Sequence, residues 1–373
     1  MKMKKRMHLL KKGKIMGLLL VFAAVFVFMQ YNAFLYQDTV VRVTSVDNTF
    51  SYDSEGPDGD VERYYDQSMK ARILNGEKRG AEISLSNTYS DSGVNDESYR
   101  KGDRLFVSVS KDVTTGTILG KKRDVYLVML ICIFLFLLLL LNEKRGGIIF
   151  ASLLINISVF LFALSMYGQG GKLISIAFAL MLVFSILTLL FAGGFHKKTF
   201  AAILSTLLTT LLCYGIYEIV LHSCKRLPYE MMDYVVNSAD LSDLFLTGVL
   251  MGSLGAVMDV SISIAAGVAE IIKQTPDISM KALIRSVREM GYDIMGTMIN
   301  VLFFTYISGA IPILVVKIKN GYTLYHLVNF QLIFEIIRFL MGAIGIVLAI
   351  PVSGLCAVLL LHMGNRNEEG QVK

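Results

Sequence analysis

Two carboxylates interrupt an apolar stretch that is long enough to cross a lipid bilayer. Residues 251–271 read MGSLGAVMDVSISIAAGVAEI and include Asp259 and Glu270. An ionised carboxylate in hydrocarbon is costly unless it is paired, hydrated or protonated, and charged groups in membrane segments usually mark ion or substrate paths. A buried ion pair can instead fix how two helices pack. The stretch therefore predicts either a polar transport site or a structural contact between helices.

Both carboxylates lie on one face of a helix. With about 3.6 residues per turn, the spacing 4, 3, 4, 4, 3, 4 collects small and polar residues into a narrow stripe. The stripe consists of Gly248, Gly252, Gly255, Asp259, Ser263, Ala266 and Glu270, and the opposite face of Leu250, Leu254, Val257, Ile264 and Val268. Because a Gly-x-x-x-Gly pair lets another helix approach closely, we expect the stripe to face a neighbouring helix and not lipid.

A second stripe follows in residues 329–351, NFQLIFEIIRFLMGAIGIVLAIP. It consists of Gln331, Glu335, Arg338, Gly342, Gly345 and Ala349. Glu335 and Arg338 are one turn apart and can form an ion pair. Counted from the outer surface, Asp259 and Arg338 both fall near the middle of the bilayer. We therefore expect an interaction between them, with Glu335 competing for the guanidinium.

Residues 291–316 add a third polar face, on which Asp293, Gly296, Thr297 and Asn300 lie together. The convergence of these stripes favours a functional polar site over helix packing alone. The residues expected to form that site are Asp259, Ser263, Glu270, Asp293, Asn300, Glu335 and Arg338. Those expected to pack helices together are Gly248, Gly252, Gly255, Gly342 and Gly345.

The composition is that of a multi-pass membrane protein. Of 373 residues, 54% are hydrophobic and only 18% are charged, which is unusual for a soluble domain. The net charge of +6 lies mostly in the amino terminus and in short loops. This placement indicates membrane topology and gives no reason to expect nucleic acid as a partner.

Neither a metal site nor a cofactor is expected. The four cysteines show no C-x-x-C or metal-type spacing, and the five histidines lie at the edges of predicted segments. The sequence also lacks a Walker A motif, the Gly-x-Gly-Asp motif of membrane aspartyl proteases and a histidine within a span that could serve a rhomboid-like serine. We therefore expect no enzymatic activity.

The amino-terminal third divides into an anchor and a β-rich domain. Residues 1–37 are predicted to form a cytoplasmic basic leader and a signal-anchor helix with its apolar segment at 15–36, a cleaved signal peptide being the alternative. Residues 38–123 alternate apolar and polar types over four or five short strands, which indicates a small OB-like or SH3-like barrel outside the cytoplasm. The acidic stretch 47–66 is predicted to be a solvated loop.

Residues 124–373 are predicted to form a seven-helix membrane domain with a cytoplasmic tail. The expected spans are 125–141, 148–167, 172–194, 199–221, 244–272, 291–316 and 328–361, which makes eight with the anchor. The leader and the three internal loops expected inside carry fifteen Lys and Arg residues together, and the three short outer loops carry five. This asymmetry agrees with the positive-inside rule. The predicted fold is thus an α-helical polytopic protein of the cell membrane with both termini in the cytoplasm.

A family resemblance supports this layout. The segment GVLMGSLGAVMDVSISIAAGVAEI resembles the most recognisable motif of the YibE/F family of bacterial membrane proteins. The order of anchor, small extracytoplasmic β-rich portion and multi-span domain is also similar, over about residues 40–363. The motif match adds weight to Gly252, Gly255, Asp259 and Glu270. The resemblance implies a cell-membrane protein, sometimes regarded as a permease, and specifies no substrate.

Two classes of function are consistent with these features. The first is a transporter in which Asp259 and Glu270 handle a cation, a proton or a small solute while Arg338 tunes or gates them. The second is a scaffold or sensor whose outer domain binds a partner. The lipid bilayer and a small ion or solute are the expected partners, with a second copy of the chain or another membrane protein as a further alternative.

Overall fold

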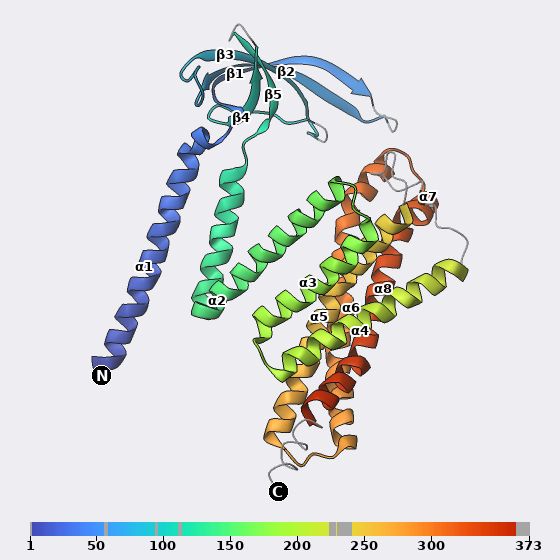
Figure 1. The fold of residues 1–373 in the computed structure, drawn as a ribbon. Helices are drawn as coiled ribbons and strands as arrows, with labels where there is room; N and C mark the ends of the chain where they lie inside the picture. Colours follow the sequence, from blue (N-terminus) through green and yellow to red (C-terminus); the bar gives the residue numbers. More distant parts are fainter. Residues whose placement is uncertain are drawn as a thin grey trace. The chain divides into compact units, whose positions relative to one another are not determined.

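The computed structural model of the chain describes residues 2–55, 59–93, 96–110, 114–223, 229 and 241–362. The chain folds into two compact units, Met1–Gly147 and Ile148–Lys373, whose elements are labelled in Figure 1. Among the described residues, eight helices are long and apolar enough to cross a membrane. This finding confirms the prediction of about eight apolar helices together with a small β domain after the first.

The first unit contains the β domain and the helices on either side of it. Its elements are α1 (Lys2–Tyr31), a 3-10 turn (Asn32–Leu35), β1 (Thr39–Glu55), β2 (Val61–Ile73), β3 (Glu82–Ser90), β4 (Arg104–Val109), β5 (Thr115–Lys121) and the beginning of α2 (Asp124–Gly168). The strands close into a barrel in the order β1-β2-β3-β5-β4. The β3–β5 pair is parallel and the other pairs are antiparallel. This is the five-stranded Greek-key arrangement of an OB-fold.

The barrel encloses a small apolar core. Alternate residues of β1, β2, β3 and β4 point inward, as the period of two requires, and Tyr99 joins them from the segment between β3 and β4. The cluster is Val41, Val43, Met69, Ala71, Ile73, Ile83, Leu85, Tyr99, Leu105 and Val107. A layer of amides covers one end of this core. The Gln67 side chain is 2% exposed and makes four hydrogen bonds, to Asn48, to Asn87 and to both backbone polar groups of Tyr99.

The acidic stretch 47–66 is not the solvated loop that the sequence indicated. Most of it belongs to the long β1–β2 hairpin, with strand pairing from Asp47↔Ser68 out to Glu55↔Val61. Aromatic rings hold the hairpin together across the strands. Tyr52 stacks on Tyr64 with ring centroids 4.6 Å apart, and Phe50 contacts Tyr65 edge to face. Such cross-strand aromatic pairs stabilise strands that polar composition alone would disfavour.

A hydrogen-bonded cluster joins the two helices to the base of the barrel. The Asp124 carboxylate accepts hydrogen bonds from the Asn32 amide and the Tyr36 hydroxyl, both at 2.8 Å. The Lys122 ammonium group is fully buried, 2.7 Å from Asp124 and 2.6 Å from the Asn32 oxygen. Because every partner is charged or strongly polar, this cluster fixes where the chain enters and leaves the barrel.

Helix α2 replaces the loop expected at residues 142–147. It contains two of the eight candidate spans, Asp124–Leu141 and Arg145–Gly168. A Cβ atom on Gly146 would lie 2.6 Å from the Leu138 carbonyl oxygen, whereas eight residues of straight helix cover about 12 Å. The helix therefore bends sharply between these residues, and Gly146 makes the close approach sterically allowed.

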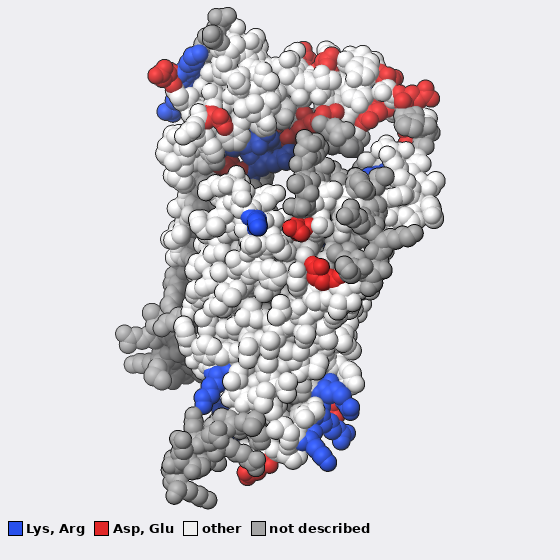
Figure 2. All heavy atoms as spheres, turned by 45° about the vertical axis from the view of Figure 1, so that its right-hand side comes forward, with Lys and Arg blue, Asp and Glu red and all other residues white. Residues whose placement is uncertain are grey.

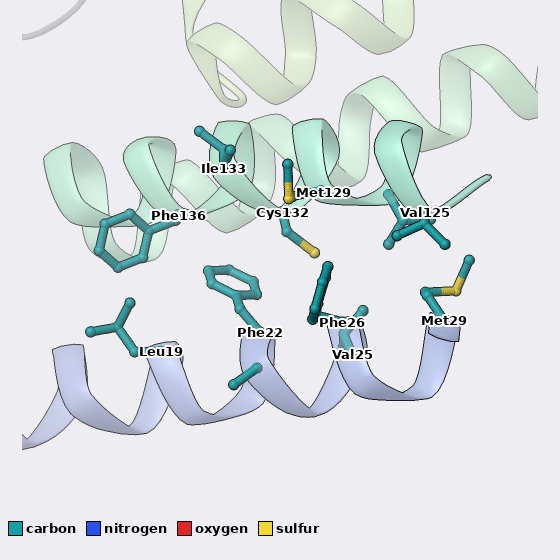
Figure 3. Close-up of a pocket in the computed structure, with 12 residues that line it drawn as sticks. Leu19, Phe22, Val25, Phe26, Met29, Val125, Met129, Cys132, Ile133 and Phe136 are labelled. Atoms are coloured by element: carbon teal, nitrogen blue, oxygen red, sulfur yellow. The ribbon is translucent and has the colours of Figure 1, made fainter. Parts of the chain in front are cut away.

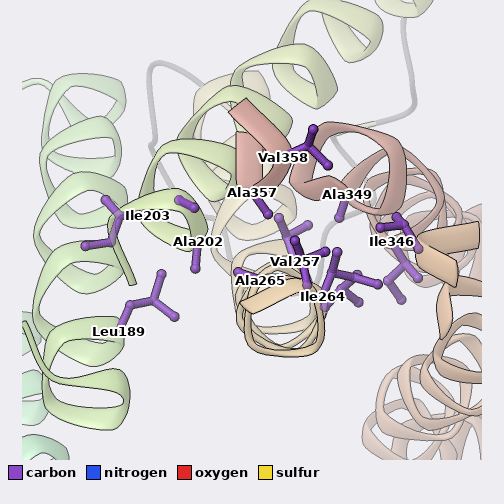
Figure 4. Packing of buried hydrophobic residues seen from close by; sticks show 14 of the residues in the cluster. Leu189, Ala202, Ile203, Val257, Ile264, Ala265, Ile346, Ala349, Ala357 and Val358 are labelled. Atoms are coloured by element: carbon purple, nitrogen blue, oxygen red, sulfur yellow. The ribbon is translucent and has the colours of Figure 1, made fainter. Parts of the chain in front are cut away.

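The second unit is a helix bundle built around one central helix. Its helices are the end of α2, α3 (Leu173–Gly193), α4 (Lys197–Ser223), α5 (Leu241–Gln274), α6 (Met280–Lys319), α7 (Leu324–Leu327), a π-helical turn (Val328–Leu332), α8 (Ile333–Ala357) and a last π-helical turn (Val358–His362). Helix α5 contacts α3, α4, α6 and α8. Figure 4 shows its residues Val257, Ile264 and Ala265 packed among side chains of the neighbouring helices.

We predict that Gln67→Leu unfolds the barrel locally. The substitution keeps the size of the side chain but leaves the Tyr99 backbone groups and two side-chain amides without their partners. The expected cost is about 2–3 kcal/mol, or roughly 30- to 150-fold faster amide exchange. Hydrogen exchange of barrel peptides in the full-length protein measures it. Ser68→Ala, on the exposed face of the same strand, is the control, and equal exchange in both variants would contradict the role of the amide layer.

Candidate functional site

The polar stripe of α5 faces the opposite way from what the sequence indicated. Gly255, Asp259, Ser263 and Glu270 are all exposed in the structure. The five branched residues of the opposite face are instead buried to 2% exposure or less: Leu250, Leu254, Val257, Ile264 and Val268. Large aliphatic side chains fill the centre of the bundle because they make the most dispersion contacts there. The small and polar stripe is left on the outside.

Only the beginning of the stripe is covered. A Cβ atom on Gly248 would lie 3.6 Å from Nε of Arg338 on α8, so the guanidinium rests on this glycine. A Cβ atom on Gly252 would lie 2.0 Å from the Tyr306 hydroxyl of α6, so the tyrosine occupies the space that the glycine leaves free. Gly255, by contrast, has open space above it. The stripe thus changes from covered to open between Gly252 and Gly255.

Arg338 pairs with Glu335 and not with Asp259. The Glu335 carboxylate and the Arg338 guanidinium form an ion pair one turn apart on α8, as the spacing predicted. Arg338 also lies over the Phe245 ring, 5.2 Å from its centroid. Gly248 and Asp259 are separated by about 16 Å of helix. The expected Asp259–Arg338 interaction is therefore wrong, because residues on two helices meet only where the packing register brings them together.

Tyr306, Glu335 and Arg338 lie over the covered part of the stripe and are called the covered group. Two of its polar atoms are unpaired. The Tyr306 hydroxyl and Nε of Arg338 are buried, and neither has a hydrogen-bond partner in the described part of the chain. Buried polar atoms usually have a protein or water partner, so these two atoms mark a place suited to water or to a polar ligand. The polar side chains of the covered group are therefore those of Tyr306, Glu335 and Arg338. Tyr306 was not among the residues predicted, although it is a hydroxyl within an apolar helix.

The covered group lies level with the first half of α3, and Asp259 lies level with its last turns. The Ile262 side chain of α5 reaches Gly193, the last residue of α3, so Asp259 lies about one turn from the level at which α3 ends. Phe178 of α3 packs against the cluster that contains Phe245 and Leu250. Asp259 lies near the middle of α5, which runs from Leu241 to Gln274, and the expectation that it lies at mid-depth in a bilayer stays a prediction.

Helix α6 brings its own polar face to the level of Asp259. The contacts of Gly252 with Tyr306 and of Gly267 with Met290 fix an antiparallel register between α5 and α6. By that register Asp259 lies level with Met298, within two residues of Asn300. Asp293, Gly296, Thr297 and Asn300 are all exposed, and the Asn300 amide donates a hydrogen bond to the Gly296 carbonyl oxygen at 2.7 Å. Exposed polar residues therefore accompany the open part of the stripe on both helices.

The glycines of α8 pack as the sequence predicted. A Cβ atom on Gly342 would lie 2.5 Å from the Leu302 side chain of α6. One on Gly345 would lie 3.1 Å from Val257 of α5 and 3.3 Å from the Cys213 sulfur of α4. These glycines let three helices approach α8 closely. Of the five glycines expected to pack helices, only Gly255 has no neighbour within 4 Å.

Two cavities in the structure are apolar and do not suit a polar substrate. One, of about 350 Å³, lies between α1 and the beginning of α2 and is lined by residues that include Phe22, Phe26 and Phe136 (Figure 3). The other, of about 590 Å³, lies between α6 and α8. No group of three or more His, Cys, Asp or Glu side chains within the described ranges is placed to hold a metal ion.

Comparison with protein families identifies the chain. The family model described as YibE/F-like protein matches residues 130–363, and the model of the YibE/F family N-terminal domain matches residues 34–121. The chain belongs to the YibE/F family. The first match contains every residue of the α5, α6 and α8 stripes, and the second contains all five strands of the barrel. Comparisons with curated proteins and with solved structures give no match.

We predict that Gly252→Ala destabilises this YibE/F protein and that Tyr306→Phe restores it. The alanine methyl group collides with the Tyr306 hydroxyl, and overpacking of this kind costs about 1–3 kcal/mol. Removing the hydroxyl costs little because it has no partner in the described structure. Thermal unfolding in detergent should give a low midpoint for Gly252→Ala and a midpoint near the wild-type value for the double variant.

Gly255→Ala is the matched control, since a methyl group there enters open space. Its midpoint should stay at the wild-type value. Equal losses for Gly252→Ala and Gly255→Ala, or no recovery on adding Tyr306→Phe, would contradict the contact between α5 and α6.

Proposed function

We propose that this YibE/F protein is a multi-pass protein of the cell membrane that transports an ion or a small polar solute along the polar stripe of α5. One observation carries the proposal: the Asp259 side chain is exposed among apolar helices and has no hydrogen-bond or ion-pair partner in the described part of the chain. Such a carboxylate is not stable against lipid. A water-filled path would satisfy it.

The open part of the stripe has the features of such a path. Gly255 leaves space above the helix, and Ser263 and Asp259 offer polar groups to water. Asn300 of α6 lies near the same level. Ionisable side chains within membrane segments almost always face the bundle interior or a water-filled cavity. The proposed path therefore runs along α5, beside the polar face of α6.

The covered part of the stripe supports a closed gate. The path continues along the same face of α5 to Gly252 and Gly248, where Tyr306 and Arg338 lie directly on the helix. An arginine held by Glu335 there presents a positive charge to whatever moves along the stripe. A transporter needs one side of its site closed while the other is open. We assign Arg338 and Tyr306 to the gate, and Asp259 to binding of the solute or ion.

The topology proposed for this function places both termini in the cytoplasm and residues 38–123 outside. The support for it is the excess of Lys and Arg in the segments expected inside. By this topology the open end of the stripe, at Glu270, faces the cytoplasm. The proposal includes no cofactor and no catalytic residue.

A scaffold or sensor function is a second candidate because of a feature of the barrel. Phe50, Tyr65 and Tyr89 form a row of ring contacts across β1, β2 and β3, beyond the amide layer of Gln67. Phe50 is 60% exposed, and aromatic side chains are frequent anchors at protein interfaces. A dispensable barrel together with an essential Asp259 favours transport, and the reverse favours the scaffold.

We predict that Asp259→Asn abolishes transport while the protein still folds. The amide keeps the size and hydrogen-bonding capacity of the side chain but removes its charge and its ability to titrate. Flux is measured with purified protein in liposomes, screened over ions with and without a pH gradient. The expected result is loss of flux with an unchanged thermal midpoint.

Asp277→Asn makes the same chemical change on an exposed residue between α5 and α6, and should transport at the wild-type rate. Full transport by Asp259→Asn would overturn the role of the stripe. Failure of Asp259→Asn to accumulate in the membrane would instead assign Asp259 a structural role.

A further inference from the structure

A row of arginines crosses three strands of the barrel. Arg42 of β1 lies directly opposite Arg72 of β2 on one side and Arg104 of β4 on the other. Partners in a ladder point to the same face of a sheet. Since Val41 and Val43 on either side of Arg42 are buried in the core, the three arginines share the outer face. Three like charges in register are unfavourable unless something compensates them.

Further basic groups gather around this row in a surface groove. The groove has a volume of about 680 Å³ and includes Arg42, Arg72, Arg79 and Lys101 in its lining. The remaining lining residues are uncharged, and no Asp or Glu is among them. Figure 2 shows basic side chains in a blue patch on the β-barrel, with acidic side chains beside the patch and along the rest of the barrel.

These cations have few partners within the protein. Arg42, Arg72, Arg79 and Lys101 are exposed, and none of them takes part in an ion pair among the described residues. Among the described residues, the four side chains make one hydrogen bond, from Nε of Arg72 to the Gly80 carbonyl oxygen at 3.3 Å. The pKa of Arg104 lies below its ordinary value, first because of burial and then because of the neighbouring charge of Arg42. One acidic residue, Glu82 of β3, lies opposite Arg72 in the same row, and the two form no ion pair among the described residues. The groove thus holds more positive charge than the protein itself neutralises.

The row ends next to the membrane-spanning part of the first unit. The guanidinium of Arg104 donates a hydrogen bond to the Gln30 carbonyl oxygen, and Gln30 lies within the candidate span Met16–Leu35. The phosphate groups of lipids lie where such a span leaves the hydrocarbon. Guanidinium groups bind phosphate through paired N–H donors, so the chemistry and the position of the groove agree on the same ligand.

We propose that the groove formed by Arg42, Arg72, Arg79 and Lys101 binds the phosphate headgroup of an anionic phospholipid. This assignment rests on the membrane placement of α1 in the proposed function, but it does not require transport. Bound headgroups would compensate the repulsion along the arginine row. They would also fix the barrel against the bilayer surface, since Arg42 and Arg104 belong to one row.

The test uses full-length protein in an uncharged detergent and a short-chain, water-soluble phosphatidylglycerol as the probe. We expect saturable binding that weakens with salt, and no comparable binding of the matching phosphatidylcholine. Arg72→Gln should weaken binding about tenfold. Arg63→Gln, on the opposite face of the same strand, should leave it unchanged.

A measurement of stability separates this role from a structural one. Without the lipid, Arg72→Gln should unfold close to the wild-type temperature, because the loss of repulsion by Arg42 offsets the loss of the Gly80 hydrogen bond and of the attraction by Glu82. With the lipid, the wild type should gain the larger upward shift. Equal weakening of binding by Arg63→Gln, or equal binding of phosphatidylcholine, overturns the proposal.

Glycerol phosphate, the soluble headgroup alone, identifies the source of the anion. If it binds as tightly as the lipid, the ligand comes from solution and the lipid assignment is wrong. None of these measurements involves flux, so the two proposals can fail separately. Lipid binding without transport would overturn the proposed function and leave the lipid site intact. Transport without lipid binding would overturn the lipid site and leave the proposed function intact.

Discussion

A carboxylate that faces out of its own helix bundle is the constraint on which the second unit, Ile148–Lys373, depends. Helix α5 can bury only one of its two faces among α3, α4, α6 and α8, and it buries the branched one. Asp259 and Ser263 are therefore left outside, where hydrocarbon would be unfavourable. Water must reach this face, or another surface must cover it. The covered end at Gly248 and Gly252 shows how the same chain seals the stripe, with a guanidinium and a phenol in place of water.

Buried polar groups in the first unit also need partners that satisfy their hydrogen bonds or charge. Gln67 satisfies both backbone groups of Tyr99 at the end of an apolar core. Lys122 is buried only because Asp124 and Asn32 surround its ammonium group. The arginine row is less well compensated, because three like charges meet in register and only Glu82, opposite Arg72 at one end, is acidic.

Local periodicity made much of this fold predictable from sequence. The eight apolar helices, the Glu335–Arg338 pair and the close packing of Gly342 and Gly345 all depend on spacing within a single helix. Which face of α5 is buried could not be predicted from the sequence. A helix with one face of small residues and one of bulky residues can bury either face. The Asp259–Arg338 contact failed for a related reason, since the register between helices depends on packing. Cross-strand stacking of Tyr52 on Tyr64 likewise turned an acidic stretch into a hairpin.

Water access to the α5 stripe inside a bilayer is the most direct test of this account. Ser263→Cys and Leu355→Cys would each be introduced after the four native cysteines are replaced. The Ser261–Ser353 hydrogen bond places the two positions at one level on α5 and α8, and both are exposed. In liposomes, a membrane-impermeant thiol reagent should modify Ser263→Cys much faster than Leu355→Cys, since thiolate forms only where water reaches. Equal and negligible modification at both positions would show that lipid or another helix covers the stripe, which contradicts the aqueous path.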